Sequence, residues 1–373
     1  MASASLILRP ADVLMFRDSR PFALGGGRAV SEHAPTPRTL LGALRAWLMT
    51  AHGVDFDAFR TKAQAQGGRL NVSDALPAEH RWIGSVRCTG PFLWKFGQTY
   101  YAAPASLVKL RSSPSSLARL VPLDKAAVPG WEPPPGSPSL LQPLGLPGDA
   151  EWEPLDGPAW MREPQLKGFL SGGTLPPARD LITSEQVRAA ETRTGITIDA
   201  MRGTVEESAL YSAVFTRLQR DWAIRVDLSY PDDNESQIKK ALQEWPWLRL
   251  GGEKRAVSIE RRKWAPHPEA QAEAHAEGSQ PLLYLATPGC FGRGWLPAAL
   301  SDTLAAAATD RPLAFSGWNL ARRRPEPSRW AVRAGAVYYL KGDAPALDND
   351  CLSDEPADRD AGWGVALKGT WTA

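Results

Sequence analysis

Cysteine is scarce in this sequence, and its three cysteines lie far apart. Cys88, Cys290 and Cys351 form no CxxC pair, and their odd number argues against a framework of disulfide bonds. Such usage is typical of a reducing compartment. We therefore expect a cytoplasmic protein.

Long apolar runs are also missing. The run from Leu6 to Leu8 is cut short by Arg9 and Pro10, so it predicts no signal peptide. No later stretch reaches the length that spans a bilayer. We expect a soluble protein with no membrane association.

The chain has little net charge of either sign. Its 43 Lys and Arg residues nearly balance 41 Asp and Glu residues, for a formal net charge of +2. A free-standing nucleic-acid-binding domain is usually strongly basic. Any nucleic-acid-binding surface must therefore be local.

The sequence lacks the usual signatures of catalysis and metal binding. It has no Walker A sequence and no GxSxG motif, and the acidic loop at 343–360 lacks the glycine and glutamate of a calcium loop. No two histidines are paired at metal-ligand spacing; they are His33, His52, His80, His267 and His275. We expect no cofactor, no metal and no enzymatic activity.

Proline and glycine are abundant, at 33 and 32 residues, and helical periodicity is rare. One clear helix begins after Thr36 with Pro37 in its first turn, and a second is predicted at 235–246. Shorter helices are predicted at 184–192 and 297–308. Most other ordered segments read as strands, including 12–16 after Pro10, a single strand at 248–262, and 281–287, 312–319, 330–340 and 364–371.

This order of elements predicts an α+β fold with two ferredoxin-like (RRM-like) βαββαβ domains. The first domain is predicted at 1–264, with a large proline-rich insertion at about 54–200. A linker is expected at 265–280 because this segment lacks an apolar pattern. The second domain is predicted at 281–373.

Two loops contain glycines in positions that suit close approach by another backbone. Gly25, Gly26 and Gly27 follow a predicted strand and precede a helix, and Arg17, Arg20 and Arg28 flank them. Backbone N–H groups there could cradle a phosphate, although a flexible loop is the simpler interpretation. Gly362 and Gly364 flank Trp363 before the last strand, where they suit close approach or a turn into an edge strand.

Two basic clusters contain tryptophan at or near their edges. Residues 249–263, which include Lys254 and Arg255, have six Lys or Arg against two Glu. Residues 322–333 have five Arg against one Glu. Arginine and tryptophan together suit single-stranded RNA, because the guanidinium binds phosphate and the indole stacks on a base. Charged strand faces would explain the clusters equally well.

Several segments together resemble one protein family. They are LRP at 8–10, DVLMFRDSRPF at 12–22, TPRTLLGALR at 36–45, ETRTGITID at 191–199, ESALY at 207–211, LGGE at 250–253, GWG at 362–364 and GTW at 369–371. In this order they resemble the third subunit of the Cmr (type III-B) CRISPR effector complex, a RAMP protein of the Cas-five-like group. Ser19 departs from the glycine that is common in this family. Residues 54–160 and 265–280 match nothing in it.

The resemblance implies a non-catalytic subunit that binds the 5′ handle of the CRISPR RNA. It implies two protein partners, the large polymerase-type subunit and a backbone RAMP subunit. The RNA-binding residues expected from the loops, the clusters and the matching motifs are Arg17, Arg20, Gly25, Gly26, Gly27, Arg28, Arg38, Arg193, Lys254, Arg255, Gly362, Trp363 and Gly364.

Three alternatives stay open at this point. The chain could be the equivalent subunit of another type III subtype. It could be a metal-independent RAMP endoribonuclease that processes precursor CRISPR RNA, with His33 as the candidate general base. It could also be a carbohydrate-active protein, because its 15 tryptophans could line a sugar cleft, but no carboxylate pair can be assigned to one site.

Overall fold

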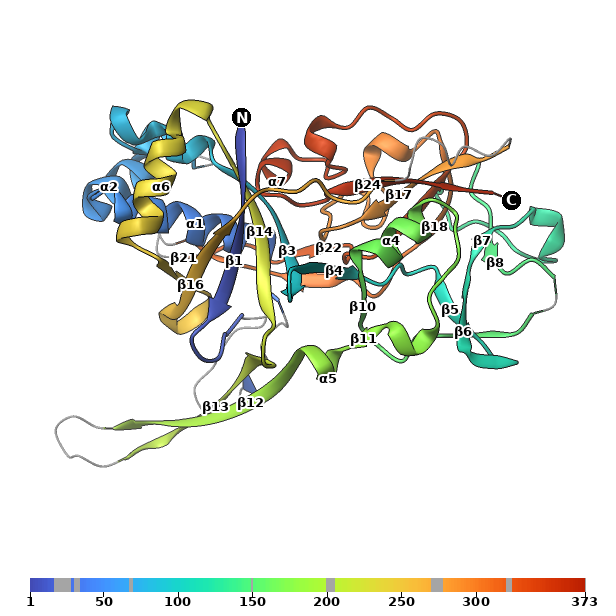
Figure 1. Cartoon of the computed structure of the whole chain (residues 1–373), viewed down its shortest axis with the longest axis horizontal. Coiled ribbons are helices and arrows are strands. Elements are labelled where there is room, and N and C mark those ends of the chain that lie inside the picture. The colour runs from blue at the N-terminus through green and yellow to red at the C-terminus, as the bar shows by residue number, and fades with distance from the viewer. Residues whose placement is uncertain are drawn as a thin grey trace. The chain divides into compact units, whose positions relative to one another are not determined.

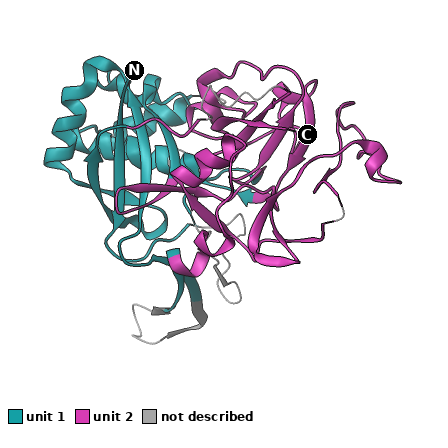
Figure 2. Cartoon of the chain, turned by 45° about the vertical axis from the view of Figure 1, so that its right-hand side comes forward, with its two compact units in different colours: residues 1–91, 187–264, 314–329 teal, residues 92–186, 265–313, 330–373 magenta. Residues whose placement is uncertain are grey.

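The structure is a computed structural model that describes residues 1–16, 28–29, 34–66, 70–148, 150–198, 205–269, 278–319 and 324–372. The chain forms two compact units, each built from separate segments (Figure 2). Unit 1 contains residues 1–91, 187–264 and 314–329, and unit 2 contains residues 92–186, 265–313 and 330–373. Most of the segment predicted as an insertion in the first domain thus belongs to unit 2.

Four of the α-helices in the described part of the chain lie in unit 1. Its α-helices are α1 (Pro37–Ala51), α2 (Phe56–Ala65), α3 (Val72–Ala75) and α6 (Glu235–Glu244). Its strands are β1 (Ala2–Pro10), β2 (Arg28–Ala29), β12 (Arg188–Ile198), β13 (Val205–Leu218), β14 (Ala223–Tyr230), β15 (Trp247–Leu250), β16 (Arg255–Arg262), β20 (Trp318–Asn319) and β21 (Arg324–Pro325). Unit boundaries fall within β3 (Arg87–Lys95), α5 (Ser184–Val187), β19 (Leu313–Phe315) and β22 (Arg329–Ala331).

The central strand of unit 1 is β1, with β14 on one side and β16 on the other, both antiparallel to it. Leu6 and Leu8 are fully buried on one face of β1. On the other face, Ser5 and the Arg225–Asp227 ion pair are also buried. A strand buried on both faces is rigidly held, so its two ends have fixed positions within unit 1.

The structure confirms the helix predicted after Thr36, which is α1. The Thr36 hydroxyl accepts a hydrogen bond from the Thr39 N–H at 3.2 Å, and Pro37 occupies the first turn. Leu40, Leu44 and Leu48 are fully buried on one face of this helix. The helix packs against β15 and α6, which places it over the sheet of unit 1.

Three sequence predictions in unit 1 are wrong in detail. The single strand expected at 248–262 is the hairpin β15–β16, because Gly251 turns the chain at a φ of +73°. Residues 12–16 are not a strand, although Leu14 forms an isolated β-bridge with Thr216. The helix expected at 184–192 is only α5, because β12 begins at Arg188 and pairs along the whole of β13.

Unit 2 consists mostly of short strands. Its strands are β4 (Gln98–Ala102), β5 (Leu107–Leu110), β6 (Ser113–Arg119), β7 (Val121–Pro122), β8 (Leu144–Gly145), β9 (Trp152–Pro154), β10 (Ala159–Arg162), β11 (Ile182–Thr183), β17 (Gln280–Leu285), β18 (Leu304–Ala308), β23 (Val337–Leu340) and β24 (Ala366–Trp371). Its α-helices are α4 (Glu163–Leu170) and α7 (Pro356–Asp360).

The core of unit 2 surrounds an antiparallel sheet with the order β18-β23-β17-β24. Tyr284, Tyr338 and Tyr339 are fully buried there. Each hydroxyl donates a hydrogen bond to a backbone carbonyl, at 2.6 Å for Tyr284 and Tyr339 and 2.9 Å for Tyr338. The buried phenols are thereby satisfied.

The prediction of a helix at 297–308 is wrong. Only residues 298–300 form a short 3-10 helix, and Leu304–Ala308 is the strand β18. Alanine favours helices, but this segment packs into the core on both faces and pairs with β23. Within the proline-rich stretch 129–158, the only strands among the described residues are the short β8 and β9.

The predicted α+β class is confirmed by the mixture of helices and antiparallel sheets (Figure 1). The described part of the chain contains no helix that is long and apolar enough to cross a membrane. All three cysteines are buried, and none of them forms a disulfide bond.

Candidate nucleic-acid interface

The glycine–arginine loop predicted to bind phosphate lies mostly outside the described residues. This is the case for Arg17, Arg20, Gly25, Gly26 and Gly27, and also for His33. Arg28 is described in its backbone only. The structure nevertheless places both flanks of this loop.

Both flanks of segment 17–27 lie against β13. Before the loop, Leu14 exchanges two backbone hydrogen bonds of 2.8 Å with Thr216. After the loop, Arg28 in β2 pairs in parallel with Ser212, four residues away from Thr216 along the same strand. The loop therefore departs from and returns to one strand.

A second backbone hydrogen bond anchors the flank that precedes the loop. The N–H of Gly252 donates a 2.7 Å hydrogen bond to the carbonyl of Met15. A Cβ on the neighbouring Gly251 would lie only 2.4 Å from the same carbonyl oxygen. Glycine is needed at this position because the β15–β16 turn approaches the backbone of Met15 and the ring of Phe16 so closely.

An arginine–carboxylate ring, formed by Asp12, Glu191, Arg193 and Arg217, lies at the base of the β12–β13 hairpin. Arg193 donates to Glu191 at 2.8 Å and to Asp12 at 2.9 Å. Arg217 donates to the other oxygens of the same carboxylates, at 2.7 and 2.8 Å. The strand register produces this arrangement, because Arg193 lies opposite Ala213, Glu191 opposite Phe215 and Arg217 opposite Ala189 on one face.

The ring neutralises its own charges. Hydrogen bonds from Arg193 and Arg217 lower the pKa of Asp12 to about 2, with Arg193 the largest cause, and they also lower the pKa of Glu191. The pKa values of both arginines are raised in turn. Two positive and two negative charges are thus fully engaged with one another.

The guanidinium of Arg193, a residue predicted to bind RNA, is therefore hydrogen-bonded to two carboxylates. Arg255 is engaged in the same way, with Glu253 at 2.5 Å and more loosely with Asp12 at 4.0 Å. Both guanidinium groups also lie over the ring of Phe215, at 5.2 and 4.9 Å from its centroid. In this geometry the two arginines fasten the hairpin to segment 12–16.

The hairpin itself extends away from the sheet and helices of unit 1 (Figure 1). Its strands pair from Arg188 and Leu218 outward to Ile198 and Val205. The ring lies at the base of this hairpin, where it joins both strands to Asp12.

The other predicted residues of unit 1 lie apart from the ring. Arg38, at the start of α1, forms an ion pair with Glu326 at 3.1 Å. Lys254 is exposed beside Glu253 in the β15–β16 turn, and both residues have positive φ angles of 51° and 55°. Among the described residues, Lys254 has no ion-pair partner.

The predicted residues of unit 2 are explained by internal packing. Trp363 is 0% exposed. A Cβ on Gly364 would lie 2.6 Å from the Ser353 hydroxyl oxygen and 2.7 Å from its backbone nitrogen. The Gly362 carbonyl accepts a 2.7 Å hydrogen bond from the hydroxyl of the buried Thr287. The close approach that these glycines permit in the structure is thus to other parts of unit 2.

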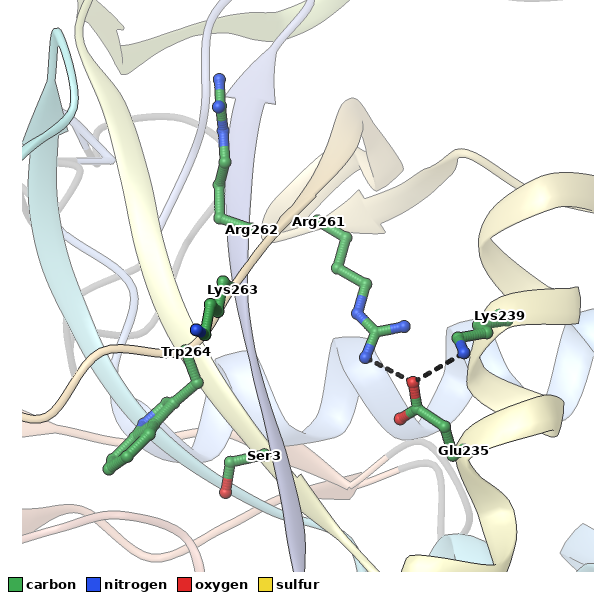
Figure 3. Close-up of a pocket in the computed structure, with 7 residues that line it drawn as sticks. All are labelled: Ser3, Glu235, Lys239, Arg261, Arg262, Lys263 and Trp264. Atoms are coloured by element: carbon green, nitrogen blue, oxygen red, sulfur yellow. Dashed lines mark hydrogen bonds and ion pairs between the residues drawn. The ribbon is translucent and has the colours of Figure 1, made fainter.

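A basic hollow of about 450 Å³ opens on unit 1 (Figure 3). It is lined by Ser3, Glu235, Lys239, Arg261, Arg262, Lys263 and Trp264. Four of these side chains are cations and one is a carboxylate. The last four residues belong to the predicted basic cluster at 249–263 and its tryptophan edge.

Glu235 receives several donors in this hollow. Arg261 donates to it at 2.7 Å, Lys239 lies 3.3 Å away, and the Tyr230 hydroxyl also donates to it. These contacts, with Tyr230 the largest cause, lower the pKa of Glu235 to about 2. Burial raises the pKa of Tyr230 to about 12, and its bond to Glu235 adds to this.

Sequence reasoning did not single out Ser3, Glu235 or Lys239. The spacing of Glu235 and Lys239 on a predicted helix does indicate an i,i+4 ion pair. The register that brings Arg261 opposite Leu6 of β1 has no signal in the sequence. No group of three or more His, Cys, Asp or Glu that could bind a metal exists among the residues that the structure describes.

Comparisons with known proteins agree with the sequence motifs. The family model described as CRISPR-associated protein (Cas_Cmr3) matches residues 6–371. No curated protein matches the sequence.

Solved structures with a similar fold include two of Type III-B Cmr-beta bound to cognate target RNA, one of them also with AMPPnP. One chain of each is similar to this chain with a TM-score of 0.51, at 14% and 15% identity, over 90% of this chain and 86% of the other. A chain of the Csm3–Csm4 subcomplex of the type III-A interference complex covers 99% of this chain at 10% identity, with a TM-score of 0.42.

Proposed function

Because this chain belongs to the Cas_Cmr3 family of CRISPR-associated proteins and is therefore a type III CRISPR effector subunit, we propose that it binds the 5′ handle of the CRISPR RNA. The observation that carries the proposal is the anchoring of both flanks of segment 17–27 against β13. A loop whose ends are fixed loses less entropy on binding than a free one. Arg17, Arg20 and Arg28, with the N–H groups of Gly25–Gly27, are the groups we assign to the RNA phosphates.

The β12–β13 hairpin supports this proposal in a second way. Its base lies on the same strand that holds the loop, and the arginine–carboxylate ring fixes its direction. We assign the ring a positioning role, so that loop and hairpin present one preorganised surface to the RNA. Arg193 and Arg255 then act through the hairpin and not by direct phosphate contact.

The finer fold assignment is part of the proposal. In unit 1 the antiparallel order β14-β1-β16, with α1 after β1 and α6 before β15 and β16, is the order expected of a ferredoxin-like domain. In unit 2 the order β18-β23-β17-β24 is again that of a βαββαβ domain whose helices are reduced. We further propose that the chain lacks nuclease activity and joins the large polymerase-type subunit to a backbone RAMP subunit in the cytoplasm.

Binding of labelled RNA tests the proposed function. The full-length chain is titrated with RNA that contains the handle and with RNA of the same composition in which the handle is scrambled. We expect Arg17→Ala/Arg20→Ala to weaken handle binding by about 1–3 kcal/mol, as for charge-assisted hydrogen bonds. The matched control is Arg111→Ala/Arg179→Ala, which removes the same charge from exposed side chains of unit 2.

An equal loss in both double variants would mean that only net charge matters. Unchanged binding in Arg17→Ala/Arg20→Ala would contradict the assignment of the loop. Cleavage of the RNA by the purified chain, abolished in His33→Ala, would contradict the absence of nuclease activity.

A further inference from the structure

We propose that the basic hollow on unit 1 is a second site for single-stranded RNA, in which one base stacks on Trp264 and the adjoining phosphates bind Lys263, Arg262 and Lys239. This inference goes beyond handle binding, because it assigns a separate contact to a different part of unit 1. The residues lining the hollow come from β1, α6 and the end of β16 with the two residues after it.

The hollow has an excess of positive charge that its own carboxylate does not cancel. Arg261 and Lys239 converge on Glu235 from two different elements (Figure 3). Lys263 has no ion-pair partner among the described residues. With four cations against one carboxylate, the lining suits an anionic ligand.

The Arg262 guanidinium is also only partly neutralised. It forms an ion pair with Glu260, and the same carboxylate lies 3.7 Å from Arg9. One carboxylate is therefore shared between two guanidinium groups. Half of the Arg262 side chain is exposed, at 56%, so a phosphate can reach it without unfolding anything.

Trp264 presents an aromatic surface at the edge of these cations. Its side chain is 42% exposed, and it lies just beyond Arg262, where β16 ends. Figure 3 shows the indole lining the same hollow as the contacts of Arg261 and Lys239 with Glu235. An exposed indole next to cations is the pairing that binds single-stranded nucleic acid, since every base has a face that can stack on it.

The composition of the lining favours RNA over a protein segment. Trp264 is the single apolar side chain among the seven that line the hollow. A protein segment gains most of its affinity from several apolar anchors, which this lining does not offer. A volume of about 450 Å³ is within the range of small-ligand sites and suits one nucleotide unit.

The hollow lies at the opposite end of β1 from the flank that precedes segment 17–27. Ser3 lies at the first end of β1, and the chain enters segment 12–16 from the other end at Pro10. Seven residues of strand separate the two positions by roughly 23 Å. Substitutions in the hollow can therefore be made without altering the anchored flank that precedes segment 17–27.

Photo-crosslinking with a handle-free RNA tests the inference on the full-length chain. The probe is a labelled 12-nucleotide oligouridylate that contains 4-thiouridine, and its affinity is measured in parallel. We expect crosslinks within residues 262–264 and a loss of affinity of about 5- to 140-fold in Trp264→Ala, as for removal of one stacked base. Trp264→Phe should retain most of the binding, and Arg262→Ala/Lys263→Ala should lower both the affinity and its salt dependence.

Two control variants lie nearby and outside the hollow. Trp247→Ala removes an indole of similar exposure, 39%, from β15, and Lys240→Ala removes an exposed charge from α6. Neither should change oligouridylate binding. Equal losses in Trp247→Ala, or crosslinks that map elsewhere, would overturn the proposal.

The same variants separate this inference from the proposed function. Trp264→Ala should keep its preference for the intact handle over the scrambled handle, and Arg17→Ala/Arg20→Ala should keep the crosslink at 262–264. If Trp264→Ala binds oligouridylate normally and instead fails to assemble with a partner protein, the hollow is a protein interface and the RNA proposal is wrong. Loss of handle preference in Arg17→Ala/Arg20→Ala would still support the handle site in that case.

Discussion

Gly364→Ala distinguishes the two interpretations of the glycines near the end of the chain. The sequence suggests that they admit RNA, and the structure places Gly364 against the backbone of Ser353. At a φ of +77°, alanine costs about 1–2 kcal/mol. The new Cβ would also overlap the Ser353 nitrogen at 2.7 Å. Relief of that overlap adds about 1–3 kcal/mol.

The backbone at this position has little freedom to withdraw. The Gly364 N–H donates to the Pro288 carbonyl, and the Gly364 carbonyl accepts from the Leu352 N–H, both at 2.7 Å. The overlap must therefore be relieved by movement of packed neighbours. We expect the free energy of unfolding to fall by about 2–5 kcal/mol in total.

Gly342→Ala is the matched control. Gly342 has a similar φ of +80°, and a Cβ there would meet nothing within 4 Å. It should cost only the conformational part, about 1–2 kcal/mol. Urea denaturation followed by circular dichroism compares the two variants, and handle affinity is measured on the folded protein. Equal stability of the two variants, with handle binding lost only in Gly364→Ala, would refute the packing explanation and favour RNA contact.

Three further predictions concern unit 1. Asp227→Asn leaves the buried guanidinium of Arg225 without its bidentate partner, and should lower the free energy of unfolding by about 3–5 kcal/mol in thermal or urea denaturation. Arg217→Met opens the arginine–carboxylate ring and should speed hydrogen exchange at the hairpin base without changing that of α1; unchanged exchange at the base would contradict the positioning role. The pKa of Glu235 is lowered in the folded state, so the stability that this carboxylate contributes is complete at pH values above its ordinary pKa and declines as pH falls toward about 2. The difference in melting temperature between wild type and Glu235→Gln should therefore shrink over this pH range. A difference that stays constant would contradict this prediction.

Local sequence signals predicted an element correctly where the residues of that element determine its structure. Thr36 and Pro37 predict the start of α1, and the apolar face of 235–246 predicts α6. They failed where tertiary packing determines the secondary structure of a segment. The alanines of β18 read as a helix, although burial on both faces makes them a strand.

In the candidate sites, likewise, the sequence identifies single residues but not the residues that they contact. The sequence marks Arg193 through a family-like motif and Arg255 through a basic cluster, but it does not show which carboxylates they contact. Asp12 and Glu191 are 179 residues apart, and only the register of β12 on β13 and the bridge at Leu14 bring them together. Likewise, the basic hollow depends on the pairing of β1 with β16, which no local pattern predicts.

Handle discrimination by the full-length chain tests the central claim most directly. The measurement is the ratio of affinities for RNA with an intact and with a scrambled handle, in wild type and in Arg17→Ala/Arg20→Ala. The proposed function predicts a clear preference for the intact handle in wild type and its loss in the double variant, with Arg111→Ala/Arg179→Ala unchanged. A wild-type chain that binds both RNAs equally would contradict it.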